Sequence, residues 1–492
     1  MSEPERPAAP NASDAAGRPK IGVDEWVASA EERHERSRGL GGLVSRGWEG
    51  SPAEAKLIVF VALASTLPFW MNEGELFSYG LYTLLYALLA LGLNIVVGFA
   101  GLLDLGYVAF YGFGAYGYAL FSSNHYGLHW QAEASIPLIV LGTAAVGLIL
   151  GLASRRLLGD YLAIVTLFFA QAFVAFVNNS NPKVAGEGLT GGPNGIPGVD
   201  PLNFFGFKLH STKQYYFFLL IVFSLAAVGL YFLNNSRTGR AWRALREDPL
   251  AAEAMSIPVN RLKILAFMFG AGTAGLTGTI FAAIQTGVVA GNFDVALLIT
   301  IYAIVILGGL GSIAGVLFGA IVINVSTQFL APSNDHPELK RWLFYGAILL
   351  IAAKIRPWSR TAAVFVGTAA FGFVVHAIAS GISSDWTNGT VVDAGSAASA
   401  IRNWVIVPSG HTGFQTWAYI VLVAAIVVTS QLKGWWRMAA LIPTLYWVAV
   451  VWENVLVQQS AVTALILFGV LLIALMQARP QGLLGTARVE IV

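Results

Sequence analysis

The sequence contains no cysteine and little charge. None of its 492 residues is Cys, and only 11% are Asp, Glu, Lys or Arg, whereas a soluble domain carries about 25% charged residues. Without cysteine the chain can form no disulfide, no thiol nucleophile and no thiolate metal site. A formal net charge of +2 is too small to indicate a nucleic-acid or acidic partner. The low charge instead indicates a membrane protein.

Short catalytic motifs are also missing. The sequence has no Gly-x-Ser-x-Gly and no His-Glu-x-x-His, and no lysine directly follows a glycine, so a phosphate-binding Gly-Lys-Ser/Thr loop is absent. His125 and His129 are a weak metal signal, because two neutral ligands from one loop do not complete a zinc site. We expect no catalytic residue, no metal site and no cofactor in this chain. If ATP drives the protein, a partner chain binds ATP with Mg²⁺ and hydrolyses it.

What the sequence does contain is long apolar runs. Hydrophobic residues make up 56% of the chain, and uninterrupted runs of roughly 18 or more can cross a bilayer as helices. Because lipid offers no partner to unpaired backbone groups, these runs predict an all-α, polytopic transmembrane helical bundle of about fourteen spans. The links at 98–104 and 308–312 are each compatible with a broken or re-entrant helix. The expected spans are residues 54–71, 76–98, 102–121, 136–153, 159–178, 215–233, 264–287, 294–308, 312–330, 342–355, 361–380, 416–432, 437–452 and 461–477.

The distribution of Lys and Arg predicts the orientation. Basic residues concentrate in alternate loops, whereas segment 122–135 has none and the loops 179–214 and 381–415 have few. By the positive-inside rule, both termini face the cytosol, and so does the loop 238–258. We expect a multi-pass protein of the plasma (inner) membrane.

The loop "TGRAWRALREDPLAAEAMSIP" (Thr238 to Pro258) is the most densely charged run between the spans. Asp248 followed by Pro249 is the signature of a helix N-cap, which predicts a short new helix. Three arginines precede the cap at a spacing of three residues. One interpretation is a solvated loop that obeys the positive-inside rule. The other is a rigid, charged knob that docks into a partner's cleft.

These residues resemble a known family. "GRAWRALREDPLAAEAMSIPVNRLKILAF" (Gly239 to Phe267) is similar to the cytoplasmic loop of the permeases of branched-chain amino acid ABC importers of the LivM type. Further similar segments are "LNIVVGFAGLLDLGYVAFYGFGAYGYALF" (93–121), "GDYLAIVTLFFAQ" (159–171), "LTGGPNGIPG" (189–198), "VILGGLGSIAGVLFGAIVI" (305–323) and "RPQGLLG" (479–485). The resemblance covers about 76–356 and the C-terminal motif.

The resemblance implies a permease subunit, not an enzyme, that moves branched-chain amino acids into the cytosol. It implies two ABC ATPase subunits, a second permease subunit that is not identical, and an extracytoplasmic substrate-binding protein. The 238–258 loop would be the coupling helix that docks on the ATPase. Ser256 departs from the family, which usually has glycine there, and a non-glycine residue in a left-handed helix end costs roughly 1 kcal/mol. The expected ATPase-coupling residues are Arg240, Trp242, Arg243, Arg246, Glu247, Asp248, Leu250, Glu253, Ala254 and Met255.

Polar residues and glycines inside the spans are candidates for a transport pathway. Glycines flank Asn94 and Asp104 in the first half and Ser312 in the second, which indicates similar helix breaks in both halves. The alternative is that these polar groups bond neighbouring helices and that small residues such as Gly112 and Gly114 allow close packing. The expected pathway residues are Asn94, Asp104, Thr166, Gln171 and Asn324. In the outer loop, Thr190, Gly191, Pro193 and Asn194 are either a gate or binding-protein contact, or a plain loop.

Composition and resemblance together divide the chain into four parts. We expect residues 1–52, which are polar and lack the apolar region of a signal peptide, to be a cytosolic and largely disordered extension. Residues 53–357 form the permease core, 358–478 add further transmembrane helices of unassigned role, and 479–492 form a cytosolic tail.

Two alternatives remain open from the sequence. A permease for urea, short amides or small carboxylates would carry the same motifs. An ion-coupled secondary transporter is disfavoured because few acids or histidines lie in the spans, although an uncharged sodium site would be compatible with it. The exact substrate and the identity of the second permease are not encoded legibly.

Overall fold

In the computed structural model, residues 53–155, 157, 159–180, 183–184, 187–329, 345, 358–389, 401–409 and 413–456 are described. Every expected span that falls on these residues coincides with a helix. The expected spans 342–355 and 461–477, the extension 1–52 and the tail 479–492 lie outside the described residues, apart from residue 345.

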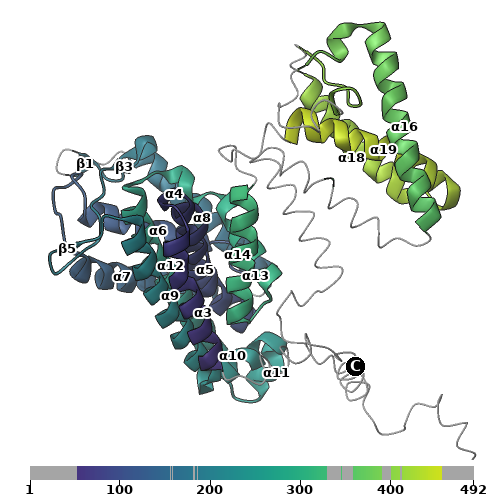
Figure 1. Cartoon of the computed structure of the whole chain (residues 1–492). Coiled ribbons are helices and arrows are strands. Elements are labelled where there is room, and N and C mark those ends of the chain that lie inside the picture. Colours follow the sequence, from purple (N-terminus) through teal and green to yellow (C-terminus); the bar gives the residue numbers. More distant parts are fainter. Residues whose placement is uncertain are drawn as a thin grey trace, which may run out of the picture. The chain divides into compact units, whose positions relative to one another are not determined.

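Helices follow one another from residue 53 to residue 179, and two of them are π-helices (Figure 1). In chain order they are α3 (Ala53–Trp70), α4 (Glu73–Glu75), the π-helix η2 (Leu76–Leu81), α5 (Tyr82–Leu93), the π-helix η3 (Asn94–Phe99), α6 (Tyr107–Phe121), α7 (Ala132–Ser154) and α8 (Asp160–Asn179). The run from α4 to η3 is continuous, so residues 73–99 make one long span.

The second half follows after a segment of short hairpins. Its elements are α9 (Thr212–Asn235), α10 (Arg237–Glu247), α11 (Pro249–Ala254), α12 (Val259–Gln285), the 3₁₀ helix η5 (Ala290–Phe293), α13 (Val295–Gly308) and α14 (Ile313–Phe329). Side-chain caps fix where two of these helices begin. Ser211 Oγ accepts from Gln214 N at 3.3 Å, and Asp294 Oδ1 accepts from Leu297 N at 3.1 Å, which satisfies donors that a helix start leaves free.

The strands are all two residues long and antiparallel. β1 (Lys183–Val184) pairs with β2 (Glu187–Gly188), and β4 (Asn203–Phe204) pairs with β5 (Phe207–Lys208). β3 (Ile196–Pro197) pairs with β6 (Gly287–Val288), with Ile196 opposite Val288. Since β6 directly follows α12, this pairing ties the α8–α9 segment to the end of α12. The fold is all-α, as predicted.

Helix α12 lies at the centre of the bundle and packs against α5, α6 and α7. Helix α5 in turn contacts α9, α13 and α14. Small residues bring α6 and α12 close together: a Cβ at Gly114 would lie 2.6 Å from the Cα of Gly275. Close backbone approach of this kind is how helices associate in lipid, where apolar burial provides no driving force between them.

Seven helical segments among the described residues are long and apolar enough to cross a membrane. They are Glu73–Phe99, Ala132–Ser154, Tyr161–Asn179, Thr212–Asn235, Val259–Gln285, Ala290–Gly308 and Ala362–Ile382. The prediction of a multi-pass helical membrane protein is therefore confirmed.

The helices after residue 357 have a core of their own. Among the described residues they are α16 (Trp358–Ile382), the 3₁₀ helix η6 (Ser384–Trp386), α18 (Phe414–Gln431), α19 (Gly434–Val451) and the π-helix η7 (Trp452–Leu456). Tyr446 and Val450 of α19 are buried with Val405 and Val407. The hydroxyls of Thr429 and Thr444, which are both buried, form a 2.9 Å hydrogen bond between α18 and α19.

We predict that Gly114→Ala destabilises the protein by about 1–3 kcal/mol, because the added methyl group would meet the backbone of Gly275, which cannot move aside as a side chain can. Gly142→Ala in α7 is the matched control, since nothing lies within 4 Å of its Cβ position. Thermal unfolding in detergent should show a lower midpoint for Gly114→Ala only. Equal midpoints in the two variants would contradict the close packing of α6 on α12.

Candidate functional site

Helix α10 is amphipathic and lies with one face on the bundle. Trp242 and Leu245 are buried, with exposed fractions of 0% and 1%, whereas Arg240 and Arg243 are exposed. The indole Nε1 of Trp242 donates to the carbonyl of Leu262 in α12 at 2.9 Å. A buried indole that has a hydrogen-bond partner is a strong anchor. Trp242 thus fixes α10 to the first turns of α12.

Helix α11 begins at the predicted cap. Oδ1 of Asp248 accepts from Leu250 N at 2.8 Å and from Ala251 N at 3.1 Å, and Pro249 occupies the first helical position. The cap makes a sharp corner between α10 and α11. We call the two helices with the C-cap residue Met255, residues 237–255, the arm.

The end of α11 is strained at Ser256. Its backbone has a φ of 62°, in the left-handed region that favours glycine. Ile257 N donates to Ala252 O at 3.1 Å and Ser256 N to Glu253 O at 3.0 Å, which satisfies carbonyls at the helix end. The serine that departs from the resembled family therefore occupies the one position of this turn where glycine is favoured.

The outer face of the arm combines apolar and charged side chains. Leu250 and Met255 have exposed fractions of 75% and 77%. The predicted coupling residues Arg240, Arg243, Glu247, Asp248, Glu253 and Ala254 are exposed as well, whereas Trp242 is buried and Arg246 is half-buried. The expected coupling set thus divides into an outer face and two residues that point inward.

The first helix break follows η3, where the chain runs from Ala100 to Gly106 without a helix. The Thr166 hydroxyl in α8 accepts from Leu105 N at 2.9 Å, and Oδ1 of Asp104 accepts from Gly106 N at 2.9 Å. Asp104 is buried. These side chains supply partners to backbone groups that lipid would leave unpaired.

The second break lies between α13 and α14. Gly309 and Gly311 have φ angles of 115° and 83° there, which only glycine adopts at low cost. Asn94 joins the two breaks, because its buried Oδ1 accepts from Gly311 N at 2.8 Å. The two glycine-rich breaks that the sequence predicts in separate halves therefore meet in space.

Two of the expected pathway residues lie elsewhere. Asn324 of α14 donates from Nδ2 to Ser78 O at 2.9 Å and to Thr83 Oγ1 at 2.8 Å, so it bonds neighbouring helices. Gln171 is exposed on α8. The structure brings Asp104 and Thr166 to the first break and Asn94 to the contact between the breaks, but it does not place Gln171 or Asn324 with them.

Sequence reasoning missed Tyr302 and the inward role of Arg246. The Tyr302 hydroxyl donates to the carbonyl of Asp104 at 2.7 Å. Nη1 of Arg246 donates to Gly98 O at 2.5 Å. A tyrosine within the apolar run of α13 was the only available signal for the first contact. No local pattern indicates the second, which joins residues 148 positions apart.

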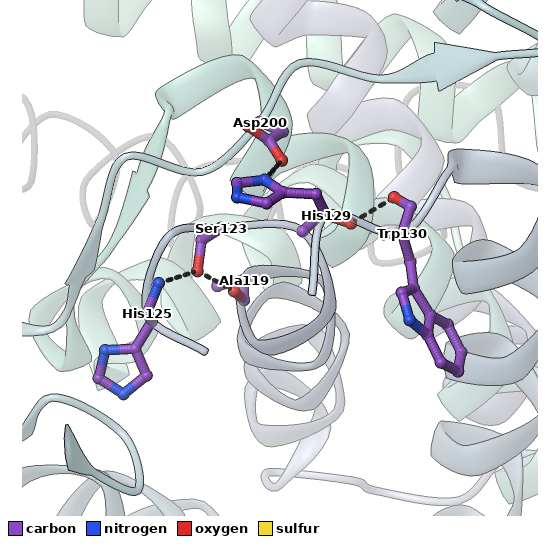
Figure 2. A network of polar contacts seen from close by, with 7 residues as sticks. Ala119, Ser123, His125, His129, Trp130 and Asp200 are labelled. Carbon is purple, nitrogen blue, oxygen red and sulfur yellow. Dashed lines mark hydrogen bonds and ion pairs between the residues drawn. The ribbon is translucent and has the colours of Figure 1, made fainter. Parts of the chain in front are cut away.

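Polar side chains hold the α6–α7 link to the α8–α9 segment near the start of α9, whereas the arm follows the end of α9 (Figure 2). Nδ1 of His129 lies 2.6 Å from Oδ2 of Asp200, as Figure 2 shows. Nε2 of His125 lies 2.7 Å from Gly188 O. The two histidines thus have separate partners. Among the described residues, no group of three His, Asp or Glu side chains could hold a metal ion.

The predicted outer-loop residues lie beside this network. The buried Thr190 hydroxyl donates to Val177 O of α8 at 2.7 Å. Gly191 has a φ of 71° and precedes the 3₁₀ helix η4 (Gly192–Asn194), in which Pro193 and Asn194 are exposed. The loop is therefore an ordered turn that is fixed to α8 at one end and to α12 through β3 and β6 at the other.

These features define an all-α, multi-pass membrane protein with two broken helices in contact and an arm at one end. The model of a family described as the permease component of branched-chain amino acid transport systems matches residues 76–353. The chain belongs to this family. It is a permease component of a branched-chain amino acid ABC transport system and is not itself an enzyme, as predicted.

Three relatives illustrate the family. The chain is 36% identical to the Escherichia coli high-affinity branched-chain amino acid transport system permease protein LivM, over 63% of this chain and 75% of that protein. It is 26% identical to Pseudomonas aeruginosa BraD, over 54% and 88% of the two chains, and 25% identical to Escherichia coli LivH, over 54% and 88%. Both of these are high-affinity branched-chain amino acid transport system permease proteins. No solved structure matches the chain.

We predict that Ser256→Gly raises the unfolding midpoint, because glycine relieves a left-handed conformation that costs roughly 1 kcal/mol in serine. Thermal unfolding of the purified protein measures this. Ser256→Ala, which keeps a Cβ and cannot relieve the conformation, is the control. A midpoint for Ser256→Gly at or below that of the unmodified chain would show that the turn carries no such strain.

Proposed function

We propose that this chain conducts branched-chain amino acids into the cytosol, driven by ATP hydrolysis on partner chains that dock on the arm. The 36% identity to LivM supports the substrate class. The exposed Leu250 and Met255 on a capped helix support the docking. Large apolar side chains with charged neighbours are typical of a protein contact.

The partners that we propose are two ABC ATPase subunits, a second permease subunit and an extracytoplasmic substrate-binding protein. LivM and LivH are both branched-chain amino acid permease proteins of Escherichia coli, and this chain is similar to both. That pair supports a second permease that is not identical to this chain. ATP and Mg²⁺ belong to the ATPases.

We also propose the finer topology: about fourteen spans, with both termini in the cytosol. The concentration of Lys and Arg in alternate loops supports the orientation. The proposed parts are the cytosolic extension 1–52, the permease core 53–357, the added helices 358–478 and the cytosolic tail 479–492. The family match over residues 76–353 supports the extent of the core.

For the pathway, we propose that Asn94, Asp104 and Thr166 belong to the moving region around the breaks. Their contacts with backbone groups of the breaks support this role. Thr190, Gly191, Pro193 and Asn194 would contact the binding protein, which the ordered turn with exposed Pro193 and Asn194 supports.

Uptake measurements test the substrate class. The complete complex, with both permeases, both ATPases and the binding protein in proteoliposomes, should import leucine, isoleucine and valine only when ATP is supplied on the ATPase side. Urea, acetamide and short carboxylates should not compete. Competition by urea or an amide would favour the alternative substrate class, and leucine uptake without ATP would contradict the proposed energy source.

Substitutions on the arm test the docking. We predict that Leu250→Asp weakens binding of the ATPase subunits by about 30-fold, since losing a central apolar contact costs about 2 kcal/mol. Reversing charge in Arg243→Glu or Glu253→Lys should lower uptake per ATP hydrolysed while the protein stays folded. Co-purification and uptake measure these effects.

The control for the docking experiment is Phe205→Asp. Phe205 has an exposed fraction of 88% and lies in the β4–β5 turn, which precedes α9, whereas the arm follows α9. The Phe205→Asp variant loses an apolar side chain that is at least as exposed as Leu250, and it should bind the ATPases normally. Equal binding by Leu250→Asp and Phe205→Asp would count against docking at α11.

A further inference from the structure

Arg246 lies in the last turn of α10, on the face that meets the bundle. It is half-buried, and its guanidinium Nη1 donates to Gly98 O at 2.5 Å. Gly98 is the second-last residue of the π-helix η3, so its carbonyl lies at the helix end that leads into the first break. A guanidinium is a rigid, permanently charged donor, well suited to a carbonyl at a helix end.

The stem of Arg246 also covers the first break. A Cβ at Gly101 would lie 2.8 Å from Cγ and 3.0 Å from Cβ of Arg246, and Gly101 has a φ of 70°. Both the backbone conformation and the arginine stem therefore require glycine at this position. The side chain is fitted against the break along its length, rather than touching it only at its tip.

The same guanidinium reaches the second break. Its Nη1 lies 3.1 Å from the position that a Cβ would take at Gly311. Gly311 N is the group that donates to Asn94 Oδ1. Arg246 therefore meets both breaks where Asn94 joins them.

The other arginines of α10 are placed differently. Arg237, Arg240 and Arg243 are exposed, and Nη1 of Arg240 donates to Asn235 O at the end of α9. Helix α10 contacts η3 as well as α12, and Trp242 fixes it to α12. The arm thus approaches the breaks through α10, and Arg246 is placed to transmit its displacement.

We propose that Arg246 is a positioning residue that links the arm to the two helix breaks. Resting on the proposed function, this link makes a movement of the docked arm change the conformation at Gly98 and Gly311, and so opens or closes the pathway. Docking on the outer face of the arm and transmission through its inner face are then separate steps, carried by different residues.

The test uses Arg246→Met, which keeps an apolar stem over Gly101 but removes the donor to Gly98. Arg237→Met, at the exposed start of α10, removes the same charge away from the breaks. Leu310→Cys, between Gly309 and Gly311, provides a reporter at the second break. Since the chain contains no cysteine, modification of this thiol is identified without ambiguity in peptides of this chain.

The complete complex in nanodiscs is treated with a hydrophilic maleimide, without nucleotide and after trapping with ATP and vanadate. In the Leu310→Cys chain alone, and with Arg237→Met, the labelling rate should differ between the two states by about fivefold or more. With Arg246→Met this difference should disappear and ATP-driven leucine uptake, measured in proteoliposomes, should fall about tenfold, while the ATPases still co-purify and hydrolyse ATP. Loss of the labelling difference and of uptake, with ATPase binding retained, would show that Arg246 acts in the link to the breaks and not in docking.

Arg246→Lys is measured in the same way and keeps the test decisive if Arg246→Met does not assemble. The lysine ammonium keeps the positive charge but lacks the forked guanidinium that reaches both Gly98 and Gly311. The labelling difference and leucine uptake should therefore both fall. Nucleotide-dependent labelling and full uptake in the Arg246 variant that assembles would overturn the link while leaving docking intact. A wild-type complex without ATP-driven uptake would overturn the proposed function, and the link with it.

Discussion

The structure depends on the need to satisfy backbone polar groups where lipid cannot. A continuous transmembrane helix pairs its own N–H and C=O groups, but a broken helix cannot, and each unpaired group costs several kcal/mol in hydrocarbon. Here side chains of helices beside the two breaks supply partners. The amide of Asn94 accepts from Gly311 N across the bundle, and the hydroxyl of Thr166 accepts from Leu105 N. The bond to Asn94 requires the second break to lie beside η3, and α5, which continues into η3, packs against α13 and α14.

The arm lies in a loop rather than in a span, so what matters there is which side chains it buries and which it exposes. Its inner face buries Trp242 and Leu245 against the bundle, which gives the arm a fixed position. Its outer face leaves Leu250 and Met255 exposed on a helix that Asp248 caps. A loop that needed only to be soluble would not hold two large apolar side chains in water on a rigid corner. Because the inner and outer faces carry different side chains, anchoring to the bundle and the proposed docking on a partner can be assigned to different residues.

The sequence predicted the helices and the caps well because both depend on local signals. Apolar runs locate the spans, and the pair Asp248–Pro249 predicts the corner at which α11 begins. The family motifs predicted the class of protein. The side of each helix that faces the protein interior was harder to predict. Because α8 is apolar on all sides, periodicity could not show that Gln171 is exposed while Thr166 is buried. Contacts between distant segments, such as Arg246 with Gly98, leave no local pattern at all.

The two contacts at the junction differ in how easily they exchange. Both bonds are partly buried, and breaking the bond from Gly311 to Asn94 would leave an amide oxygen and a backbone N–H unpaired, at a cost of about 1–3 kcal/mol each. The guanidinium of Arg246 instead carries five N–H donors on a long side chain, so it can exchange Gly98 O for another acceptor more easily. A cyclic motion needs one contact that persists and one that exchanges. In the mechanism that we propose, movement of the arm makes and releases the arginine contact in each cycle, while the asparagine contact holds the breaks together.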